Sequence, residues 1–230
     1  MNKLYKGDCL EVMKLIPSGS IDAIITDPPY GTTACKWDSV INFELMWEQL
    51  NRIIKPNGAI VLFGSEPFSS ALRMSNIGMF QYDIVWEKSL CASFHHAKSR
   101  PLKIHENVII FSKGKSSNNA NLRVNYYPQM SKGLYEKKPS KETNKPSDYR
   151  PNRKNNIKKS DKNYNGNLRY PNSVIKYTNA SNKNRGLHPT QKPIALMEYL
   201  IKTYTKEGET VLDFTMGSGS TGVAAKNLNR

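Results

Sequence analysis

Apolar residues along this chain follow two alternating patterns. Short, nearly continuous apolar runs are separated by longer stretches in which apolar residues recur every three or four positions. The first pattern is typical of strands buried on both faces, and the second of helices that cover a sheet. The pattern predicts strands at 4–5, 21–26, 59–64, 80–87, 107–111 and 209–214. It predicts helices at 9–16, 42–54, 66–76, 193–205 and 223–228. We therefore expect an α/β fold with a mostly parallel, doubly wound sheet.

The helix at 42–54 has the clearest pattern. Its apolar residues form one broad face, and Lys55-Pro56-Asn57-Gly58 follows directly. Because proline and glycine interrupt a helix, we expect these four residues to end it and the next strand to begin at Ala59.

Three aspartates fall at or beside the ends of expected strands. They are Asp8, Asp27 and Asp213. Open α/β sheets bind ligands beyond the carboxyl ends of their strands. The sequence therefore predicts that these carboxylates gather at one edge of the sheet.

The segment 114–186 has a different character. It is rich in Asn, Lys, Ser, Pro and Tyr, and it has few aliphatic residues and no sustained periodicity. By composition it could be a basic linker that is partly disordered. Against a passive linker, seven tyrosines are interleaved with its basic residues, a combination suited to stacking and phosphate contacts. These are Tyr126, Tyr127, Tyr135, Tyr149, Tyr164, Tyr170 and Tyr177.

The charge of the chain is concentrated in the same region. The net charge is +15, and residues 113–185 hold eighteen Lys and Arg against four Asp and Glu. That stretch therefore accounts for +14 of the total, and the remainder is nearly neutral. A charge of this sign and size indicates a nucleic-acid partner.

The cysteines, histidines and apolar runs exclude several classes of protein. Cys9, Cys35 and Cys91 are isolated, without C-x-x-C spacing, and adjacent His95 and His96 lack metal-ligand spacing. We therefore expect a reducing compartment, no disulfide framework and no metal site. No signal peptide or membrane span is evident in the sequence, which favours a soluble, cytoplasmic protein with no membrane partner.

Asp27-Pro28-Pro29-Tyr30 follows the apolar run at 21–26. Each proline fixes its backbone and lacks an N–H, so the tetrapeptide presents acceptors, the Asp27 carboxylate and the Pro28 carbonyl. Such acceptors suit an exocyclic amino group of a nucleobase, whose ring could lie on Tyr30. The plainer alternative is a surface turn, because Asp-Pro and Pro-Pro are common turn dipeptides.

A glycine-rich loop at 215–222 follows the last expected strand and leads into a helix. Glycines let a ligand approach the backbone, and the free N–H groups of a helix start attract anions. The spacing of Gly217, Gly219 and Gly222 also fits the dinucleotide pattern G-x-G-x-x-G. That pattern needs an acidic residue about twenty positions later, beyond Arg230, so this alternative cannot be tested from the sequence.

Three motifs together resemble the amino-group DNA methyltransferases that use S-adenosylmethionine. These are Asp27-Pro28-Pro29-Tyr30, His188-Pro189-Thr190-Gln191-Lys192-Pro193, and the run from Asp213 to Thr221. The catalytic motif comes first and the cofactor loop last, which resembles the circularly permuted beta class. Segments 7–13 and 105–113 also look like that family, so the resemblance covers roughly 1–113 and 186–230.

The resemblance implies a Rossmann-like methyltransferase fold in three stretches. Residues 1–113 would form the catalytic part and 187–230 the cofactor part of one domain, with 114–186 as a basic inserted target-recognition region. It implies methyl transfer from S-adenosylmethionine to N6 of adenine in double-stranded DNA, without a covalent enzyme intermediate. In relatives the last helix is followed by a strand that binds the cofactor ribose, so the C-terminus is expected to be shortened.

The resemblance also assigns site residues. The catalytic residues would be Asp27, Pro28, Pro29 and Tyr30. The cofactor residues would be Asp8, Cys9, Asp27, Lys192, Asp213, Phe214, Gly217, Gly219, Ser220 and Thr221. Within this set Asp8 would accept from the cofactor adenine, and Lys192 would face the cofactor carboxylate. Asp213 would contact the cofactor or cap the loop, and Phe214 would pack on the adenine or under the loop.

Several alternatives remain open at the level of sequence. Asp at the first position of the tetrapeptide favours adenine-N6 over cytosine-N4 by association with the family. A DNA-binding relative with impaired catalysis and an RNA methyltransferase are further alternatives. A homodimer is also open, because a second chain could complete a shortened site. Neither the DNA recognition sequence nor the presence of a cognate restriction enzyme can be read from these residues.

Overall fold

The computed structural model describes residues 3–33, 35, 38–91, 94–133, 167–179 and 191–230. The chain divides into two compact units, one of residues 1–127 and 172–230 and a smaller one of residues 128–171. We describe each unit by itself.

A six-stranded sheet forms the centre of the larger unit, in the order β7-β3-β4-β2-β1-β8. The strands are β1 (Ile21–Thr26), β2 (Ile54–Gly64), β3 (Phe80–Lys88), β4 (His105–Phe111), β7 (Val174–Tyr177) and β8 (Val211–Leu212). Pairs β8·β1, β1·β2 and β3·β7 are parallel, and β4 pairs antiparallel with both β2 and β3. Within this sheet β4 therefore runs against five strands of common direction, which confirms the mostly parallel α/β class.

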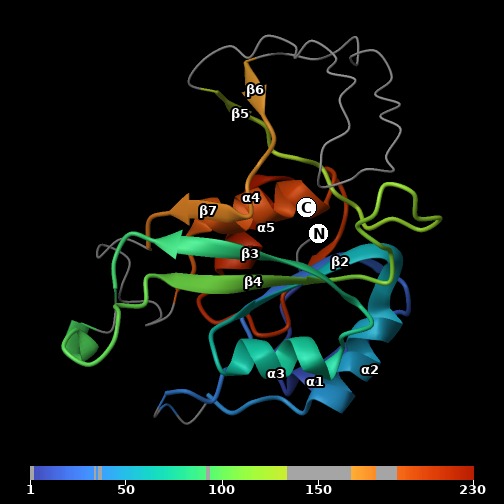
Figure 1. The fold of residues 1–230 in the computed structure, drawn as a ribbon. Helices are drawn as coiled ribbons and strands as arrows, with labels where there is room; N and C mark the ends of the chain where they lie inside the picture. The colour runs from blue at the N-terminus through green and yellow to red at the C-terminus, as the bar shows by residue number, and fades with distance from the viewer. Residues whose placement is uncertain (1–2, 34, 36–37, 92–93, 134–166, 180–190) are drawn as a thin grey trace, which may run out of the picture. The chain divides into compact units, whose positions relative to one another are not determined.

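Helices cover both faces of the sheet (Figure 1). They are α1 (Cys9–Met13), α2 (Phe43–Ile53), α3 (Phe68–Ser75), α4 (Ile194–Tyr204) and α5 (Ser220–Asn227), with a short 3-10 helix η1 (Phe94–His96) between β3 and β4. One core cluster joins α4 and α5 to one face, and another joins α1, α2 and α3 to the opposite face. The sheet is therefore doubly wound.

The strand β1 shows why the apolar runs are nearly continuous. All six of its residues are buried. Ala23 and Ile25 pack toward α4 and α5, whereas Ile21 and Ile24 pack toward α1 and α2. With helices on both faces, a polar side chain in this strand needs a partner, which Asp22 finds in Lys55 and Thr26 finds in Asp213.

Two of the strand expectations are wrong, one at residues 4–5 and one at residues 55–58. Residues 4–5 form no strand in the structure. Helix α2 does end at Ile53, but β2 begins at Ile54, so Lys55–Gly58 lies within the strand. The register shifts between Ile21 and Ala23 of β1, an irregularity that accommodates Pro56. A Cβ on Gly58 would lie 2.7 Å from the Asp22 carbonyl oxygen, so glycine at 58 permits a close strand approach rather than a turn.

The smaller unit contains a two-stranded antiparallel pair, β5 (Ser131–Lys132) and β6 (Leu168–Arg169). Most of the predicted recognition region, and with it the expectation of partial disorder, lies outside the described residues. In the part of the chain that is described, no helix is long and apolar enough to cross a membrane.

Candidate functional site

Parallel pairing of β1 and β8 brings distant parts of the chain together. Ala23 pairs with Val211 and Ile24 with Leu212, so both strands end at the same edge of the sheet. The Asp27 tetrapeptide leaves one strand there, and the glycine loop leaves the other. Residues nearly two hundred positions apart thus meet in one pocket, as the sequence predicted.

That pocket is a cavity of about 340 Å³. It is lined by Asp27, Pro28, Pro29, Tyr30, Thr32, Thr33, Asp38, Glu106, Gln191, Lys192, Met197, Asp213, Thr215, Met216, Gly217, Ser218, Ser220 and Thr221. The size falls in the range of small-molecule sites, roughly 300–1,000 Å³.

Hydrogen bonds join the two strand ends inside the pocket. The Thr26 hydroxyl lies 2.5 Å from Asp213 Oδ1 and 2.5 Å from the Thr215 hydroxyl. Thr215 also donates from its hydroxyl to the Asp27 carbonyl oxygen, at 3.1 Å, and from its backbone N–H to Asp213. Burial raises the pKa of the Asp213 carboxyl, although hydrogen bonds from Thr221, Thr26 and Thr215 oppose the rise. Asp213 therefore acts in the structure as the cap of its loop.

Both carboxylate oxygens of Asp27 have partners. The Tyr30 hydroxyl donates to Oδ1 at 2.6 Å, and the Lys192 ammonium pairs with Oδ2. The Tyr30 ring stacks on Phe68, with centroids 5.0 Å apart. Burial, followed by the charges of Asp27 and Glu106, raises the pKa of Tyr30 well above its usual value, so the hydroxyl stays protonated as a donor.

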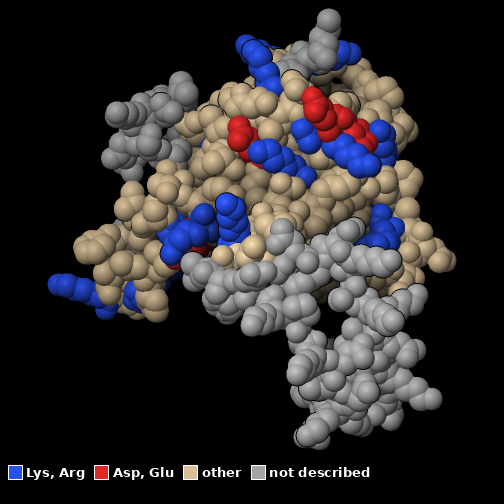
Figure 2. Space-filling model, turned by 90° about the horizontal axis from the view of Figure 1, so that it is seen from above, with Lys and Arg blue, Asp and Glu red and all other residues tan. Residues whose placement is uncertain are grey.

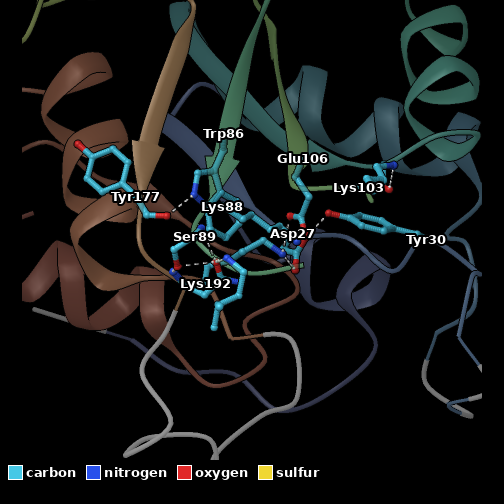
Figure 3. A network of polar contacts seen from close by, with 12 residues as sticks. Asp27, Tyr30, Trp86, Lys88, Ser89, Lys103, Glu106, Tyr177 and Lys192 are labelled. Atoms are coloured by element: carbon cyan, nitrogen blue, oxygen red, sulfur yellow. Dashed lines mark hydrogen bonds and ion pairs between the residues drawn. The ribbon is translucent and has the colours of Figure 1, made fainter. Parts of the chain in front are cut away.

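Lys192 lies between two carboxylates (Figure 3). Its Nζ pairs with Asp27 and lies 3.3 Å from Glu106 Oε2, and Lys88 pairs with the other oxygen of Glu106. Burial alone would lower the pKa of Lys192, but Asp27 and Glu106 raise it. Burial likewise pushes the pKa of Glu106 up, and Lys192 and Lys88 bring it below its usual value.

The loop after the tetrapeptide is wrapped around Asp38. One oxygen of this carboxylate accepts from the N–H groups of Tyr30 and Gly31, and the other from those of Thr32 and Thr33, at 2.7–2.9 Å. Burial opposes ionisation, yet these bonds and one from the Thr33 side chain lower the pKa of Asp38. One carboxylate therefore organises this wall of the pocket.

The glycine loop has the geometry that its sequence predicts. Gly217 and Gly219 have φ of 53° and 79°, a left-handed conformation that disfavours other residues. No atom lies within 4 Å of a Cβ built on Gly219, so backbone conformation and not space requires glycine there. Gly219 is the N-cap of α5, which places Ser220 and Thr221 in the first turn of the helix.

Some expected site residues lie elsewhere. Asp8 is exposed and caps α1 by accepting from the Leu10 N–H at 2.8 Å, and neither it nor Cys9 lines the pocket. Burial and the neighbouring Asp8 charge raise the pKa of Cys9, which keeps the thiol protonated. Phe214 packs against the core cluster that joins α1, α2 and α3 to the sheet.

Sequence reasoning missed several pocket residues. Glu106, Asp38 and Thr215 line the pocket but were not proposed, nor was the buried Thr26, which bonds to Asp213 and Thr215. A glutamate within the apolar run of β4 was a usable signal for Glu106, whereas nothing local marked Asp38. The residues His188, Pro189 and Thr190 lie outside the described part of the chain. Across the described residues no cluster of His, Cys, Asp and Glu is arranged to hold a metal ion.

Comparison with protein families agrees with this geometry. A family model described as DNA methylase, N6_N4_Mtase, matches residues 21–230, which is most of the chain. The chain belongs to the N6/N4 DNA methylase family. Type II methyltransferase M.HpaI of Haemophilus parainfluenzae is 29% identical over 99% of this chain, and M.BglII of Bacillus subtilis is 28% identical over all of it. The chain spans 68% and 64% of these two relatives, about two thirds of their length.

Solved structures with the same fold include other DNA methyltransferases. The cytosine-N4-specific PvuII DNA methyltransferase aligns with a TM-score of 0.64 at 19% identity, covering 98% of this chain and 78% of that one. The complex of M1.HpyAVI with SAM aligns with a TM-score of 0.57 at 26% identity, covering 98% and 88%. The first likeness shows the methyltransferase fold alone.

Proposed function

We propose that this protein transfers a methyl group from S-adenosylmethionine to the exocyclic N6 of adenine in DNA. The main support is that the Asp27 tetrapeptide and the glycine loop line one cavity, as a reaction between a cofactor and an amino group requires. Membership of the DNA methylase family makes DNA the natural substrate. The proposal extends to a role in restriction and modification, since the relatives named are type II methyltransferases.

The cavity suits S-adenosylmethionine in size and in chemistry. A relative at 26% identity forms a complex with SAM. In our proposal the glycine loop, with Gly217 and Gly219, admits the methionine portion, and Ser220 and Thr221 offer hydroxyl and N–H groups at the start of α5. Asp213, which also lines the cavity, holds the start of the loop through the Thr215 N–H. Because Lys192 pairs with Asp27, we assign its ammonium to the acceptor side of the pocket rather than to the cofactor carboxylate.

The target amine is a weak nucleophile, because its lone pair is delocalised into the base. In our proposal Asp27 and the Pro28 carbonyl accept hydrogen bonds from it, which localises the lone pair and aims it. Tyr30 and Lys192 already occupy the two carboxylate oxygens of Asp27, so the incoming amine must share one of these oxygens or displace its partner. The bound cofactor supplies a methyl group activated by its sulfonium charge. One proton must leave the amine, and Asp27 is placed to receive it.

Adenine is preferred over cytosine because the tetrapeptide begins with Asp. This preference rests on the resemblance of the motif. The basic region 114–186 is assigned to DNA contact because it holds nearly all of the net positive charge. Residues 1–113 and 187–230 would supply the catalytic and cofactor parts of the domain.

Sequencing the methylated bases in DNA from cells that express the protein tests the proposal most directly. It reports the modified base and its sequence context together, with cells expressing Asp27→Ala as the control. N6-methyladenine at a defined site is expected in the wild-type sample alone. N4-methylcytosine would correct the base, and unmethylated DNA would refute the activity.

An assay with purified protein separates the remaining alternatives. Labelled S-adenosylmethionine is incubated with duplex DNA or with RNA, and cofactor binding is titrated in parallel. We expect label in DNA. Label in RNA alone would indicate an RNA methyltransferase, and DNA binding without cofactor binding would indicate an impaired relative.

A further inference from the structure

Four charged side chains from four separate segments form a series of ion pairs that ends at Asp27 of the catalytic tetrapeptide (Figure 3). Lys88 ends β3, Glu106 lies on β4, Lys192 precedes α4 and Asp27 follows β1. Each group pairs with the next, from Lys88 to Glu106, Lys192 and Asp27. The middle pair is the most enclosed, since the side chains of Lys192 and Glu106 are 8% and 13% exposed.

A contribution to the stability of the fold does not by itself explain why a glutamate is buried at position 106. Removing a carboxylate and an ammonium from water costs several kcal/mol for each ion, and packed apolar residues often do as well or better in such places. Moreover, Glu106 Oε2 is buried without a well-aligned hydrogen-bond donor, although the Lys192 Nζ lies only 3.3 Å away. A buried acceptor that is incompletely used calls for an explanation.

We propose that Glu106 is a positioning residue that keeps the Lys192 ammonium beside Asp27 and accepts that ammonium when the target amine engages Asp27 Oδ2. This inference rests on the proposed function. Glu106 itself would not touch the substrate.

The physical reason for this role is that the Lys192 ammonium and the target amine compete for Asp27 Oδ2. The Lys192 ammonium holds Oδ2 by a charge-assisted bond, which is stronger than the bond a neutral amine donates. If Glu106 were absent, a shift of the ammonium away from Oδ2 would leave a buried charge unpaired. Because Glu106 Oε2 lies 3.3 Å from Lys192 Nζ, the ammonium can exchange the Asp27 carboxylate for that of Glu106. Lys88 holds Oε1, which keeps Oε2 directed at Lys192.

The arrangement has a consequence for pH dependence. The charged and titratable groups facing Lys192 are Asp27, Glu106 and Tyr30, and the Phe63 ring lies 5.1 Å from its Nζ. Burial favours the neutral amine, and the two carboxylates favour the ammonium. Replacing Glu106 with a neutral residue removes one of those carboxylates. Lys192 should then lose its proton at a lower pH, and activity should fall at a lower pH with it.

The test compares Glu106→Gln with Glu106→Asp and with Glu87→Gln. Glu87 is a matched control, because it lies on neighbouring β3 and pairs with the exposed Lys176. Methyl transfer to duplex DNA is measured from pH 6 to 10, together with cofactor affinity. For Glu106→Gln we expect kcat to fall by about 10²-fold, as for other small misplacements of reacting groups. Because the pKa of Lys192 lies above its usual value, wild type should show no loss from this group up to pH 10, whereas Glu106→Gln should lose activity toward the alkaline end. The cofactor Kd should change less than about twofold, and Glu106→Asp should recover part of the loss.

The outcomes separate the two proposals. If wild-type protein methylates DNA but Glu106→Gln keeps its kcat and pH profile, the role of Glu106 is refuted and the proposed function stands. An inactive wild type refutes the proposed function, and this inference falls with it. Should Glu106→Gln fail to fold, Lys88→Gln loosens the same carboxylate. A reduced kcat in that variant supports the proposal, and an unchanged kcat contradicts it.

Discussion

At the scale of single residues, the site is built on two acceptors, each of which binds one neighbour in sequence and one residue from a distant segment. Asp27 receives the Tyr30 hydroxyl and the Lys192 ammonium, and Asp213 receives Thr26 and Thr215. The tetrapeptide could be recognised from sequence because its residues are contiguous. Glu106 left only one signal, a glutamate within the apolar run of β4, because its pairing with Lys192 arises only in the folded chain.

Replacing Asp27 tests the catalytic role most sharply. Asp27→Ala removes the carboxylate that would orient the amine, and we expect methyl transfer to fall by about 10³-fold or more. DNA affinity should change little, because phosphate contacts supply most of it. Initial rates and a DNA-binding titration on the same preparation check both parts. Glu11→Ala, at an exposed carboxylate paired with Lys14, is the control. Full activity in Asp27→Ala would exclude Asp27 from the mechanism.

The raised pKa of Asp213 predicts how the stability of the protein depends on pH. Since folding raises its pKa, the folded protein holds the proton more tightly than the unfolded chain. That stabilisation is complete below the unfolded pKa, near 3.9, and is lost as pH rises through the folded value. Ionised Asp213 therefore costs stability near neutral pH. We expect Asp213→Asn, which keeps an acceptor, to melt at a higher temperature than wild type at pH 7.

Thermal melts across pH 4–8 measure this effect. The difference between Asp213→Asn and wild type should shrink as pH falls toward 4. Asp213→Ala removes the acceptors for Thr26 and Thr215, so it should be less stable than Asp213→Asn by about 1 kcal/mol or more for each bond lost. A gap between Asn and wild type that widens toward acid would contradict the assignment.

At the scale of elements, strands covered on both faces could be predicted from the sequence, and strands whose local composition resembles a turn could not. The strand at 21–26 was predicted correctly because burial on two faces requires mainly apolar residues. Residues 55–58 have the composition of a turn but belong to an irregular part of β2. The irregularity depends on pairing with β1, which the local sequence does not show. The loop held by Asp38 could not be predicted, because one carboxylate serves four N–H groups through a conformation that leaves no repeating pattern.

Replacing Asp38 should loosen that loop. The amide nitrogen of Asn accepts no hydrogen bond, so Asp38→Asn leaves two of the four N–H groups without a partner. We expect unfolding to become easier by about 2 kcal/mol or more, given roughly 1.5–3 kcal/mol for a bond to a charged group. Chemical denaturation measures this change. Glu44→Gln, at an exposed carboxylate in the first turn of α2, should stay within about 0.5 kcal/mol of wild type. Equal stability of the two variants would show that the loop does not depend on Asp38.

At the scale of the whole molecule, most of the positive charge lies in a different part of the sequence from the residues that line the pocket. On the face drawn in Figure 2, basic and acidic side chains of the described residues lie side by side at several places. The excess positive charge belongs to residues 113–185, between the two stretches that we propose to contribute the catalytic and cofactor residues. The strands that lead to the pocket, β1 and β8, lie outside this segment, whereas β7 at one edge of the sheet lies within it, so charge can vary in the rest of the segment without altering the sheet.

This separation predicts how salt should act on DNA binding. Each phosphate contact that is lost lowers the slope of log Kobs against log salt by about 0.9. Lys158→Gln with Lys159→Gln should therefore flatten the slope by up to about 1.8 and weaken binding to all sequences alike. Lys206→Gln with Lys226→Gln removes equal charge beside the amino end of β8 and at the last turn of α5, away from the carboxyl edge. Binding isotherms from 50 to 300 mM salt compare the pairs. The control pair should leave the slope unchanged, and if both pairs flatten it equally, net charge and not the inserted region governs DNA contact.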